Sequence, residues 1–272
     1  MNTQVQTNSA AADLKARITA RIQELAEATD TARMSAEMRR YLDTCARFHK
    51  YSLFNVIQIL MTRPEATSVA GFKKWQSMGR FVRRGERGIP ILAPIISKVI
   101  DEDGEEREKL VGFKVVYVFD IAQTEGEPLP EPPDWKSPEQ NAGLQERLVR
   151  FAERKGIQVE VKALGREIQG VSMGGRIILD PQAGTKTLIH EIAHELLHHA
   201  HEIIPTERTI YELEAESVAY VVGKHFGLSG LSSPNYVALH GATAELVMEH
   251  LEQVRNTAAE IIRALEVEVP NS

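Results

Sequence analysis

The sequence predicts an α+β protein made of two domains. Apolar residues recur at helical spacing near both ends of the chain, which indicates amphipathic helices. Two strand-like runs, at about residues 90–100 and 110–121, flank an Asp-Gly turn and predict a β-hairpin. Five prolines between residues 124 and 140 then separate the two halves of the chain. With 272 residues, of which 43% are hydrophobic, each half can bury a core of its own.

The N-terminal half begins with a small, polar stretch that we expect to be disordered. The expected elements are, in order, a disordered tail at residues 1–11, helices at about 12–29 and 35–61, a short helix with tight turns at 67–88, and the two strands of the hairpin. A break is expected in the second helix near Tyr51. Pro64 ends this helix, because proline lacks the backbone N–H and disfavours helix in the residue before it.

The C-terminal half combines a small, partly antiparallel sheet with helices, which is typical of an α+β arrangement. The expected elements are, in order, a helix at about 141–155, strands at 157–163 and 175–179, and helices at 186–200, 206–226 and 240–265. The domain boundaries that follow are a first domain at residues 12–125, a proline-rich linker at 126–140 and a second domain at 141–272.

Charge is unevenly distributed along the chain. Residues 39–98 hold twelve basic and three acidic side chains, a net charge of +9, whereas the whole chain carries −6. Such a segment favours a polyanionic partner, although a solvated basic surface would have the same composition. The single cysteine, Cys45, excludes an intrachain disulfide framework. No apolar run is long enough to span a membrane or to act as a secretory signal, so we expect a cytoplasmic protein with no membrane partner.

The stretch HEIAHELLHH, residues 190–199, contains an HExxH motif within a segment of helical periodicity. His190 and His194 are four residues apart, so both imidazoles can face one Zn²⁺ ion from the same side of a helix. Glu191 is placed to act as the general base that takes a proton from the attacking water. A histidine-rich, solvent-facing helix end without a metal is the alternative.

A catalytic zinc site needs a third protein ligand and one open position. His198 lies about 12 Å beyond His190 along a straight helix, which is too far for one ion to bind both. The next helix carries ELEAESVA, residues 212–219, whose small alanines allow a close helix contact. Glu212 is therefore the expected third ligand. Glu216, one turn later, is expected to hydrogen-bond a ligating imidazole.

Several positions around the motif stay open. We expect Glu214 to be a solvated residue on the surface of its helix. The strand that ends at Asp180 is expected to be an edge strand that aligns an extended peptide by main-chain pairing. The spacing does not choose a residue that would stabilise the developing oxyanion, and the candidates are Tyr211, Tyr220, His199 and His240.

Aromatic residues are interleaved with the basic side chains of residues 47–87. A positive groove with aromatic platforms holds the backbone and the bases of a single-stranded nucleic acid. Tyr51 and Trp75 are candidates for stacking on bases, although each could instead belong to a hydrophobic core. The candidate nucleic-acid-binding residues are Tyr51, Lys73, Lys74, Trp75, Arg80, Arg83, Arg84 and Arg87.

The C-terminal motifs resemble those of a known peptidase family. HEIAHELLHH followed by ELEAESVAYVV is similar to the zinc metallopeptidases of the ImmA/IrrE group, which implies a zincin-like fold for the second domain. The resemblance implies that the zinc ligands are His190, His194 and Glu212, and that Glu191 is the general base.

The N-terminal half resembles a second family. RFHKYSLFNVIQILMTRPEATSVAGFKKWQSMGRFVRRGERGIPILAPI, residues 47–95, and VYVFDIAQTEGEPLP, residues 116–130, are similar to the single-stranded-DNA-binding domain of the ArdC antirestriction proteins. Proteins of that type join such a domain to a zinc peptidase domain, in the order found here. A preference for DNA over RNA rests on this resemblance and not on composition.

Together these features predict a Zn²⁺-dependent endopeptidase that single-stranded DNA directs to a protein or peptide substrate, in antirestriction or the protection of transferred mobile-element DNA. A non-catalytic, single-stranded-DNA-binding protection factor with a structural zinc site is one alternative. An ImmA-like regulatory peptidase that cleaves a repressor is another. The presence of Glu191 argues against the first alternative, and the +9 segment argues against the second.

Overall fold

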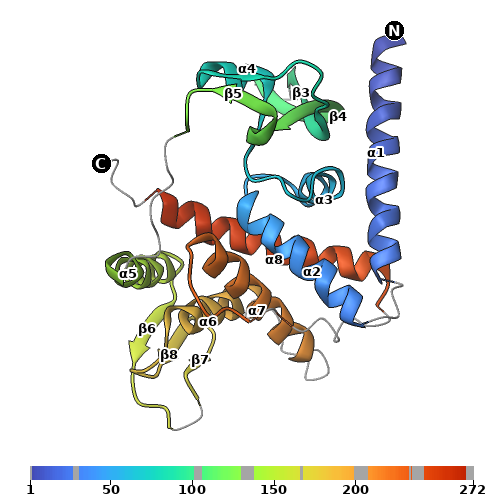
Figure 1. The fold of residues 1–272 in the computed structure, drawn as a ribbon. Helices are drawn as coiled ribbons and strands as arrows, with labels where there is room; N and C mark the ends of the chain where they lie inside the picture. Colours follow the sequence, from blue (N-terminus) through green and yellow to red (C-terminus); the bar gives the residue numbers. More distant parts are fainter. Residues whose placement is uncertain are drawn as a thin grey trace. The chain divides into compact units, whose positions relative to one another are not determined.

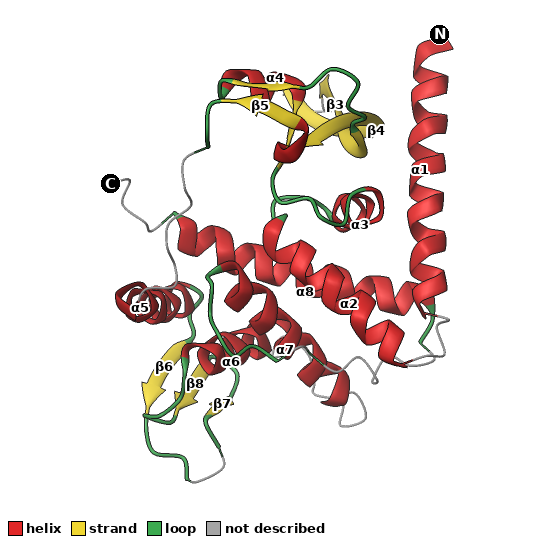
Figure 2. Cartoon of the chain, in the orientation of Figure 1, coloured by secondary structure: helices red, strands yellow, loops and turns green. Residues whose placement is uncertain are grey.

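The computed structural model describes residues 2–26, 31–100, 106–129, 138–165, 168–198, 208–232, 234 and 242–267. The chain divides into two compact units, which we call unit 1 and unit 2 (Figure 1 and Figure 2). Unit 1 consists of Met1–Gln23 and Tyr51–Glu131, and unit 2 consists of Glu24–Lys50 and Pro132–Ser272. The later boundary falls inside the predicted linker. Residues 24–50, however, join the C-terminal unit and not the domain expected at residues 12–125.

Unit 1 combines helices with short antiparallel strands. Its elements are α1 (Asn2–Ala26), α3 (Leu53–Thr62), β1 (Val69–Gly71), α4 (Phe72–Ser77), β2 (Arg80–Val82), β3 (Ile89–Ile100), β4 (Glu106–Asp120), the 3-10 helix η1 (Ile121–Gln123) and β5 (Thr124–Gly126). β3 and β4 form the predicted hairpin, whose turn lies outside the described residues. β1 pairs with the other edge of β4, and β2 pairs with β5.

Helix α1 starts much earlier than the sequence predicts. The sequence favours a disordered tail at residues 1–11, but α1 begins at Asn2, so this expectation is wrong. Leu14, Ile18 and Ile22 are buried along one side of the helix. Once a helix has formed there, each further residue adds a backbone hydrogen bond at little cost. The alanines and glutamines of the tail have favourable helix propensities, so the helix extends through them.

A buried aspartate joins the strands of unit 1 to the segment before β1. Asp120, the last residue of β4, is only 1% exposed. Its carboxylate accepts hydrogen bonds from the backbone N–H groups of Thr67 (2.8 Å), Ser68 (3.1 Å) and Ala122 (2.9 Å). Its own N–H donates to the side chain of Gln123 at 2.9 Å, which completes a capping box. These bonds hold β1, β4 and η1 together.

Unit 2 packs helices against a small mixed sheet. Its elements are α2 (Thr31–Arg47), α5 (Pro138–Arg154), β6 (Gln158–Val161), β7 (Gly170–Ser172), β8 (Arg176–Leu179), α6 (Thr185–Leu197), α7 (Arg208–His225) and α8 (Ala244–Glu266). β8 lies between the other two strands, parallel to β6 and antiparallel to β7. The gap between α2 and α3 confirms the predicted helix break, and β7 is a strand that the sequence did not predict.

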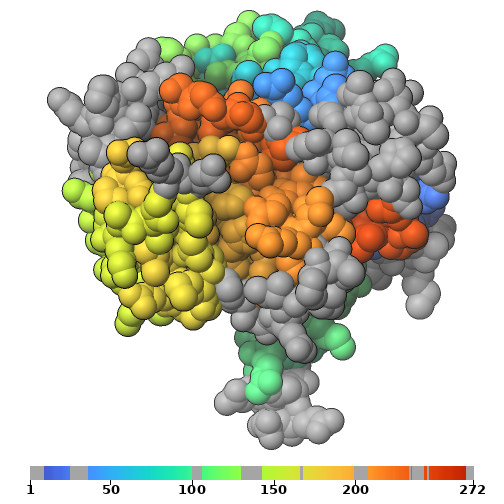
Figure 3. All heavy atoms as spheres, turned by 90° about the horizontal axis from the view of Figure 1, so that it is seen from below, coloured from blue at the N-terminus to red at the C-terminus, as the bar shows by residue number. Residues whose placement is uncertain are grey.

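Helix α7 passes through the core of unit 2, in contact with α2, α6 and α8. Gly227, just beyond its end, has a φ of 70°, a left-handed conformation that favours glycine after a helix. On the face shown in Figure 3, α6 lies between the small sheet and α7. None of the helices in the described ranges combines the length and the apolar character that a membrane span needs.

Replacing Asp120 by Ala will destabilise the protein, because three backbone N–H groups lose a charged acceptor. We expect the free energy of unfolding to fall by on the order of 3 kcal/mol. Urea denaturation followed by circular dichroism measures the change. The control is Glu65→Ala, whose side chain is 68% exposed and for which the expected change is below about 0.5 kcal/mol. Equal effects of the two substitutions would contradict this role of Asp120.

Candidate metal centre

Helices α6 and α7 carry the polar residues of the site on the sides that face each other. Four apolar residues of α6 are fully buried in the core, which turns the HExxH side chains toward an open cleft. These four residues are Leu188, Ile189, Ile192 and Ala193. On α7, Ala215 and Ala219 are also fully buried, and such small side chains allow two helices to approach closely.

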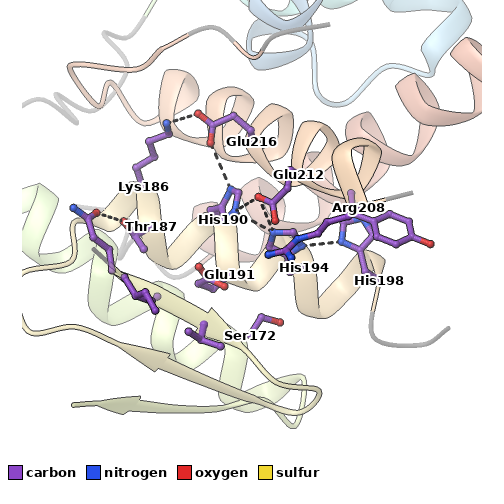
Figure 4. A pocket seen from close by; sticks show the side chains of 15 residues that line it. Ser172, Lys186, Thr187, His190, Glu191, His194, His198, Arg208, Glu212 and Glu216 are labelled. Atoms are coloured by element: carbon purple, nitrogen blue, oxygen red, sulfur yellow. Dashed lines mark hydrogen bonds and ion pairs between the residues drawn. The ribbon is translucent and has the colours of Figure 1, made fainter. Parts of the chain in front are cut away.

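The two helices bring together three side chains that could hold a metal ion (Figure 4). Nε2 of His190 lies 3.0 Å from Nε2 of His194, and Oε2 of Glu212 lies 3.4 Å and 3.7 Å from these nitrogens. Atoms that share one tetrahedral ion at about 2.0–2.1 Å stand about 3.4 Å from one another. The donor set and its spacing therefore fit a divalent metal ion.

Carboxylates hold the first imidazole in place. Oε2 of Glu216 lies 3.5 Å from Nδ1 of His190, where the sequence predicted an orienting contact, and Lys186 forms an ion pair with the same carboxylate. Burial alone would lower the pKa of His190, but Glu212 and Glu216 together raise it to about 9. The two imidazoles beside Glu212 keep the pKa of its carboxyl group well below its usual range.

A chain of hydrogen bonds behind the site holds the second imidazole. Glu214 is 3% exposed and accepts hydrogen bonds from Nε2 of His198 at 2.9 Å and Nδ1 of His250 at 2.6 Å. Because His198 donates through Nε2, its Nδ1 accepts from Nδ1 of His194, 2.9 Å away. Nε2 of His194 then keeps its lone pair toward Glu212. Burial would raise the pKa of Glu214, but the two histidines lower it, so the carboxylate is ionised.

Two expectations from the sequence change as a result. Glu214 is not a solvated surface residue, because α8 supplies a histidine that covers it. His198 is not part of the three-residue cluster that could hold a metal, as the helix geometry indicated, but it hydrogen-bonds His194, which belongs to that cluster. The sequence offered no signal for either role, since His250 is distant along the chain.

Glu191 faces the same cleft, which has a volume of about 880 Å³. Burial raises the pKa of its carboxyl group, although His190 and His194 oppose the shift. Gly170 of β7 lies directly against it, because a Cβ atom at this glycine would stand 2.8 Å from Cγ of Glu191. The carboxylate is thus confined beside the metal-binding side chains, with a pKa moved toward the range of a general base.

The strand beside this cleft is β7 and not β8. The sequence predicted that the strand ending at Asp180 lies at an edge, but β6 and β7 pair with its two sides, so that prediction is wrong. Glu195 of α6 holds the turn between β7 and β8. Its carboxylate accepts from Oγ of Ser172 (2.8 Å) and from the backbone N–H groups of Met173 (3.0 Å), Gly174 (3.0 Å) and Gly175 (2.6 Å).

The candidates for stabilising an oxyanion differ in whether they line the cleft. Tyr211 lines the cleft, with its ring centroid 4.5 Å from that of His198. Tyr220 is buried and donates to Oδ1 of Asp43 at 2.8 Å, so it is not available to the cleft. His199 and His240 lie outside the described residues. Arg208, which the sequence reasoning missed, is a further cationic residue in the lining.

The candidate nucleic-acid-binding residues of unit 1 divide into structural and exposed ones. Trp75 is 1% exposed and donates to the backbone oxygen of Phe119, so it is a core residue and not a stacking platform. Tyr51 is half-buried and bonded to Val69. Arg80 bonds to the side chain of Thr124 and to the backbone oxygens of Gly126 and Glu127 at the end of β5.

Arg83 bonds to Glu86 and Ala122. Five predicted residues are exposed, and these are Lys73, Lys74, Arg83, Arg84 and Arg87. Of these, Arg83 is engaged by the bonds just named.

An aromatic surface that the sequence reasoning missed lies on the hairpin. Phe113 and Tyr117 of β4 are 42% and 59% exposed. They share one face because side chains alternate along a strand, and this period-two pattern was visible in the sequence. Tyr117 lies against Gly88, one residue after Arg87, so the aromatic surface continues from the basic turn at residues 84–87.

Unit 2 thus contains a two-histidine, one-glutamate centre, and unit 1 contains a basic and aromatic surface. Residues 12–119 match the family model described as the N-terminal domain of anti-restriction factor ArdC, which confirms the resemblance of the N-terminal half. The likeness of unit 2 to ImmA/IrrE peptidases stays a prediction from the sequence.

Full-length comparisons give more distant likenesses. The chain is 24% identical over 288 residues to pXO2-81, an uncharacterized protein of Bacillus anthracis, across 86% of this chain and 48% of that protein. The chain therefore spans about half the length of this relative.

The crystal structures of the antirestriction protein ArdC from plasmid R388 are also similar. The metal-free structure has 17% identity and a TM-score of 0.48, covering 79% of this chain and 84% of that one. The Mn(II)-bound structure has 16% identity and a TM-score of 0.47, covering 89% and 97%.

Glu214→Gln will weaken metal binding, because an amide presents a donor where the carboxylate accepts from two imidazoles. Loss of such an outer hydrogen-bond partner reduces metal affinity by about 10–100-fold. Competition with a chromogenic chelator measures the affinity. Glu249→Gln, an exposed position on α8, is the matched control. An affinity equal to that of the control would exclude this positioning role.

Proposed function

We propose that this protein is a metal-dependent endopeptidase that single-stranded DNA directs to its protein substrates. The observation that carries the proposal is the convergence of His190, His194 and Glu212 beside the buried carboxyl group of Glu191. Two imidazoles and one carboxylate are the ligands of a catalytic zinc site, so we propose Zn²⁺ as the metal. The partial exposure of Glu212, whose side chain is 52% exposed, leaves the centre open to a substrate.

The residues of the cleft have distinct parts in peptide hydrolysis. A bound Zn²⁺ ion would supply a Lewis acid that polarises the peptide carbonyl and makes a water molecule more acidic. Glu191 would take the proton from that water and later pass it to the leaving amine. The edge strand β7 would pair with the extended substrate, and Tyr211 or Arg208 would face the developing oxyanion.

The N-terminal part supports a single-stranded DNA partner. The match of residues 12–119 to the ArdC N-terminal domain supports a role in antirestriction or in protecting transferred DNA. The basic turn at residues 84–87 would contact phosphates, and the exposed rings of Phe113 and Tyr117 would stack on bases. The DNA would bring the peptidase to proteins bound to the same strand.

Glu191→Gln tests the peptidase activity. Protein stripped with chelator and reloaded with Zn²⁺, or with Mn²⁺ in a parallel series, is incubated with a DNA-bound test protein, with and without single-stranded DNA. We expect the wild type to cleave the test protein or itself in the presence of DNA. Loss of a general base lowers the rate by about 10²–10⁴-fold, so the variant should be inactive while it still binds metal and DNA.

The control for this experiment is Glu153→Gln, an exposed position on α5 that should keep full activity. Equal cleavage by the wild type and Glu191→Gln would refute the assigned base. If every sample binds DNA and none cleaves any substrate in a proteome-wide digest, the protein acts by binding. A non-catalytic protection factor is then the function.

Tyr117→Ala will weaken binding to single-stranded DNA, because the exposed ring is lost as a stacking platform. We expect a loss of about 1–3 kcal/mol of binding free energy. Arg84→Ala should reduce the salt dependence of log K by about 0.7. Fluorescence anisotropy with a labelled oligonucleotide at several salt concentrations measures both effects. Arg150→Ala, on the exposed side of α5, is the control, and variants that bind like it would rule out this surface.

A further inference from the structure

A second group of metal-ligating side chains lies in unit 2, separate from the cleft. His49, His225 and Glu266 place one donor atom each within 4.8 Å of one another. His49 follows the end of α2, His225 is the last residue of α7, and Glu266 is the last residue of α8. These helix ends lie on the same side of unit 2 in Figure 1.

The spacing of the donor atoms resembles that in the cleft. Nε2 of His49 lies 3.6 Å from Oε2 of Glu266, and Nε2 of His225 lies 3.4 Å from Oε1 of the same carboxylate. The two imidazole rings are 4.9 Å apart between centroids and nearly perpendicular, at 82°. Ligands of one tetrahedral ion stand about 3.4 Å apart, so a small shift would bring all three donors onto an ion.

The surroundings of His49 indicate that this group of side chains binds a ligand. Its side chain is only 6% exposed. Neither of its ring nitrogens has a hydrogen-bond partner within the part of the chain that the structure describes. Buried polar atoms without a partner are rare in folded proteins, and each one needs a reason. A metal ion would satisfy the nitrogen that faces Glu266.

His225 already has the orientation that a metal ligand needs. Its Nδ1 lies 2.9 Å from the backbone oxygen of Ala46, to which it donates. This bond leaves the lone pair of Nε2 directed toward Glu266. Imidazoles that bind metal ions commonly have this arrangement, in which the other ring nitrogen donates to a carbonyl or carboxylate.

The electrostatic environment also favours a cation. The ends of α2, α7 and α8 each carry the partial negative charge of a helix C-terminus. Two basic residues oppose this field, Arg263 and Lys50, and Nζ of Lys50 lies 3.2 Å from Oε2 of Glu266. The Lys50 side chain is 65% exposed, so it can turn into water when an ion takes its place.

We propose that His49, His225 and Glu266 form a second divalent-metal site, of the kind that takes Zn²⁺, and that its role is structural. An ion there would link the ends of three helices that are far apart in the sequence. It would fasten the segment after α2 to the core of unit 2. Glu266 is 30% exposed, which leaves a path for the ion and room for a water ligand.

Metal stoichiometry tests this proposal. Full-length protein is stripped with chelator, saturated with Zn²⁺, freed of excess metal and measured for zinc per chain. We expect two ions in the wild type and one in His225→Ala or in Glu266→Gln. His194→Ala, which disrupts the cleft centre, should also keep one ion. In the His194→Ala background, Zn²⁺ should raise the Tm, and adding Glu266→Gln should abolish that rise.

Glu260→Gln is the matched control, because this glutamate lies on the exposed side of α8 and pairs with Lys155. It should keep both ions. Since Glu266→Gln preserves size at a partly exposed position, circular dichroism should show it folded even where His225→Ala is not.

The outcomes for the two sites are distinct. One ion in the wild type that His194→Ala removes and Glu266→Gln keeps would overturn the second site alone. One ion with the opposite behaviour would support the second site and refute the metal centre in the cleft.

Discussion

The close contact between α6 and α7 is the constraint on which the candidate metal centre depends. α6 supplies two imidazoles, and the third donor comes from α7, so neither helix forms the centre alone. The fully buried Ala215 and Ala219 let the helix axes approach until Glu212 lies within 3.7 Å of both ligand nitrogens. Beside this contact lies the cleft, which α6, α7 and β7 line and where Gly170 of β7 lies against Glu191. The packing of α6 against α7 therefore also determines the geometry of the candidate metal centre.

Two buried carboxylates, those of Glu214 and Glu195, hold the side chains and the turn beside this interface in fixed positions. Glu214 connects α7 to α6 and α8 through His198 and His250, and the direction of these hydrogen bonds decides which nitrogen of His194 carries the proton. Glu195 fixes the turn that carries β7. A buried charge is costly unless every oxygen is bonded, so these groups tolerate few alternative arrangements. The side chains around the cleft are held in position before any ligand binds.

Unit 1 uses its charged and aromatic residues in two different ways. Trp75, Arg80 and Arg83 are occupied in holding strands and turns together, whereas Arg84, Arg87 and Tyr117 point outward. Composition alone treats both groups as one basic, aromatic segment. Burial identifies Trp75 as a core residue, whereas Arg80 and Arg83 are distinguished by their hydrogen bonds to Thr124, Glu86 and the backbone.

The sequence by itself determined the local features of this protein. It was sufficient for the hairpin, for most helix positions, and for the placing of His190, Glu191 and His194 on one helix, since these depend on residues close together in the chain. It did not determine the environment of Glu214 on α7. With 3.6 residues per turn, Glu212 and Glu216 share one face and Glu214 lies on another. Only tertiary packing decided that His198, after α6, and His250 of α8 enclose Glu214, because the rotation of a helix about its axis is set by partners distant in sequence.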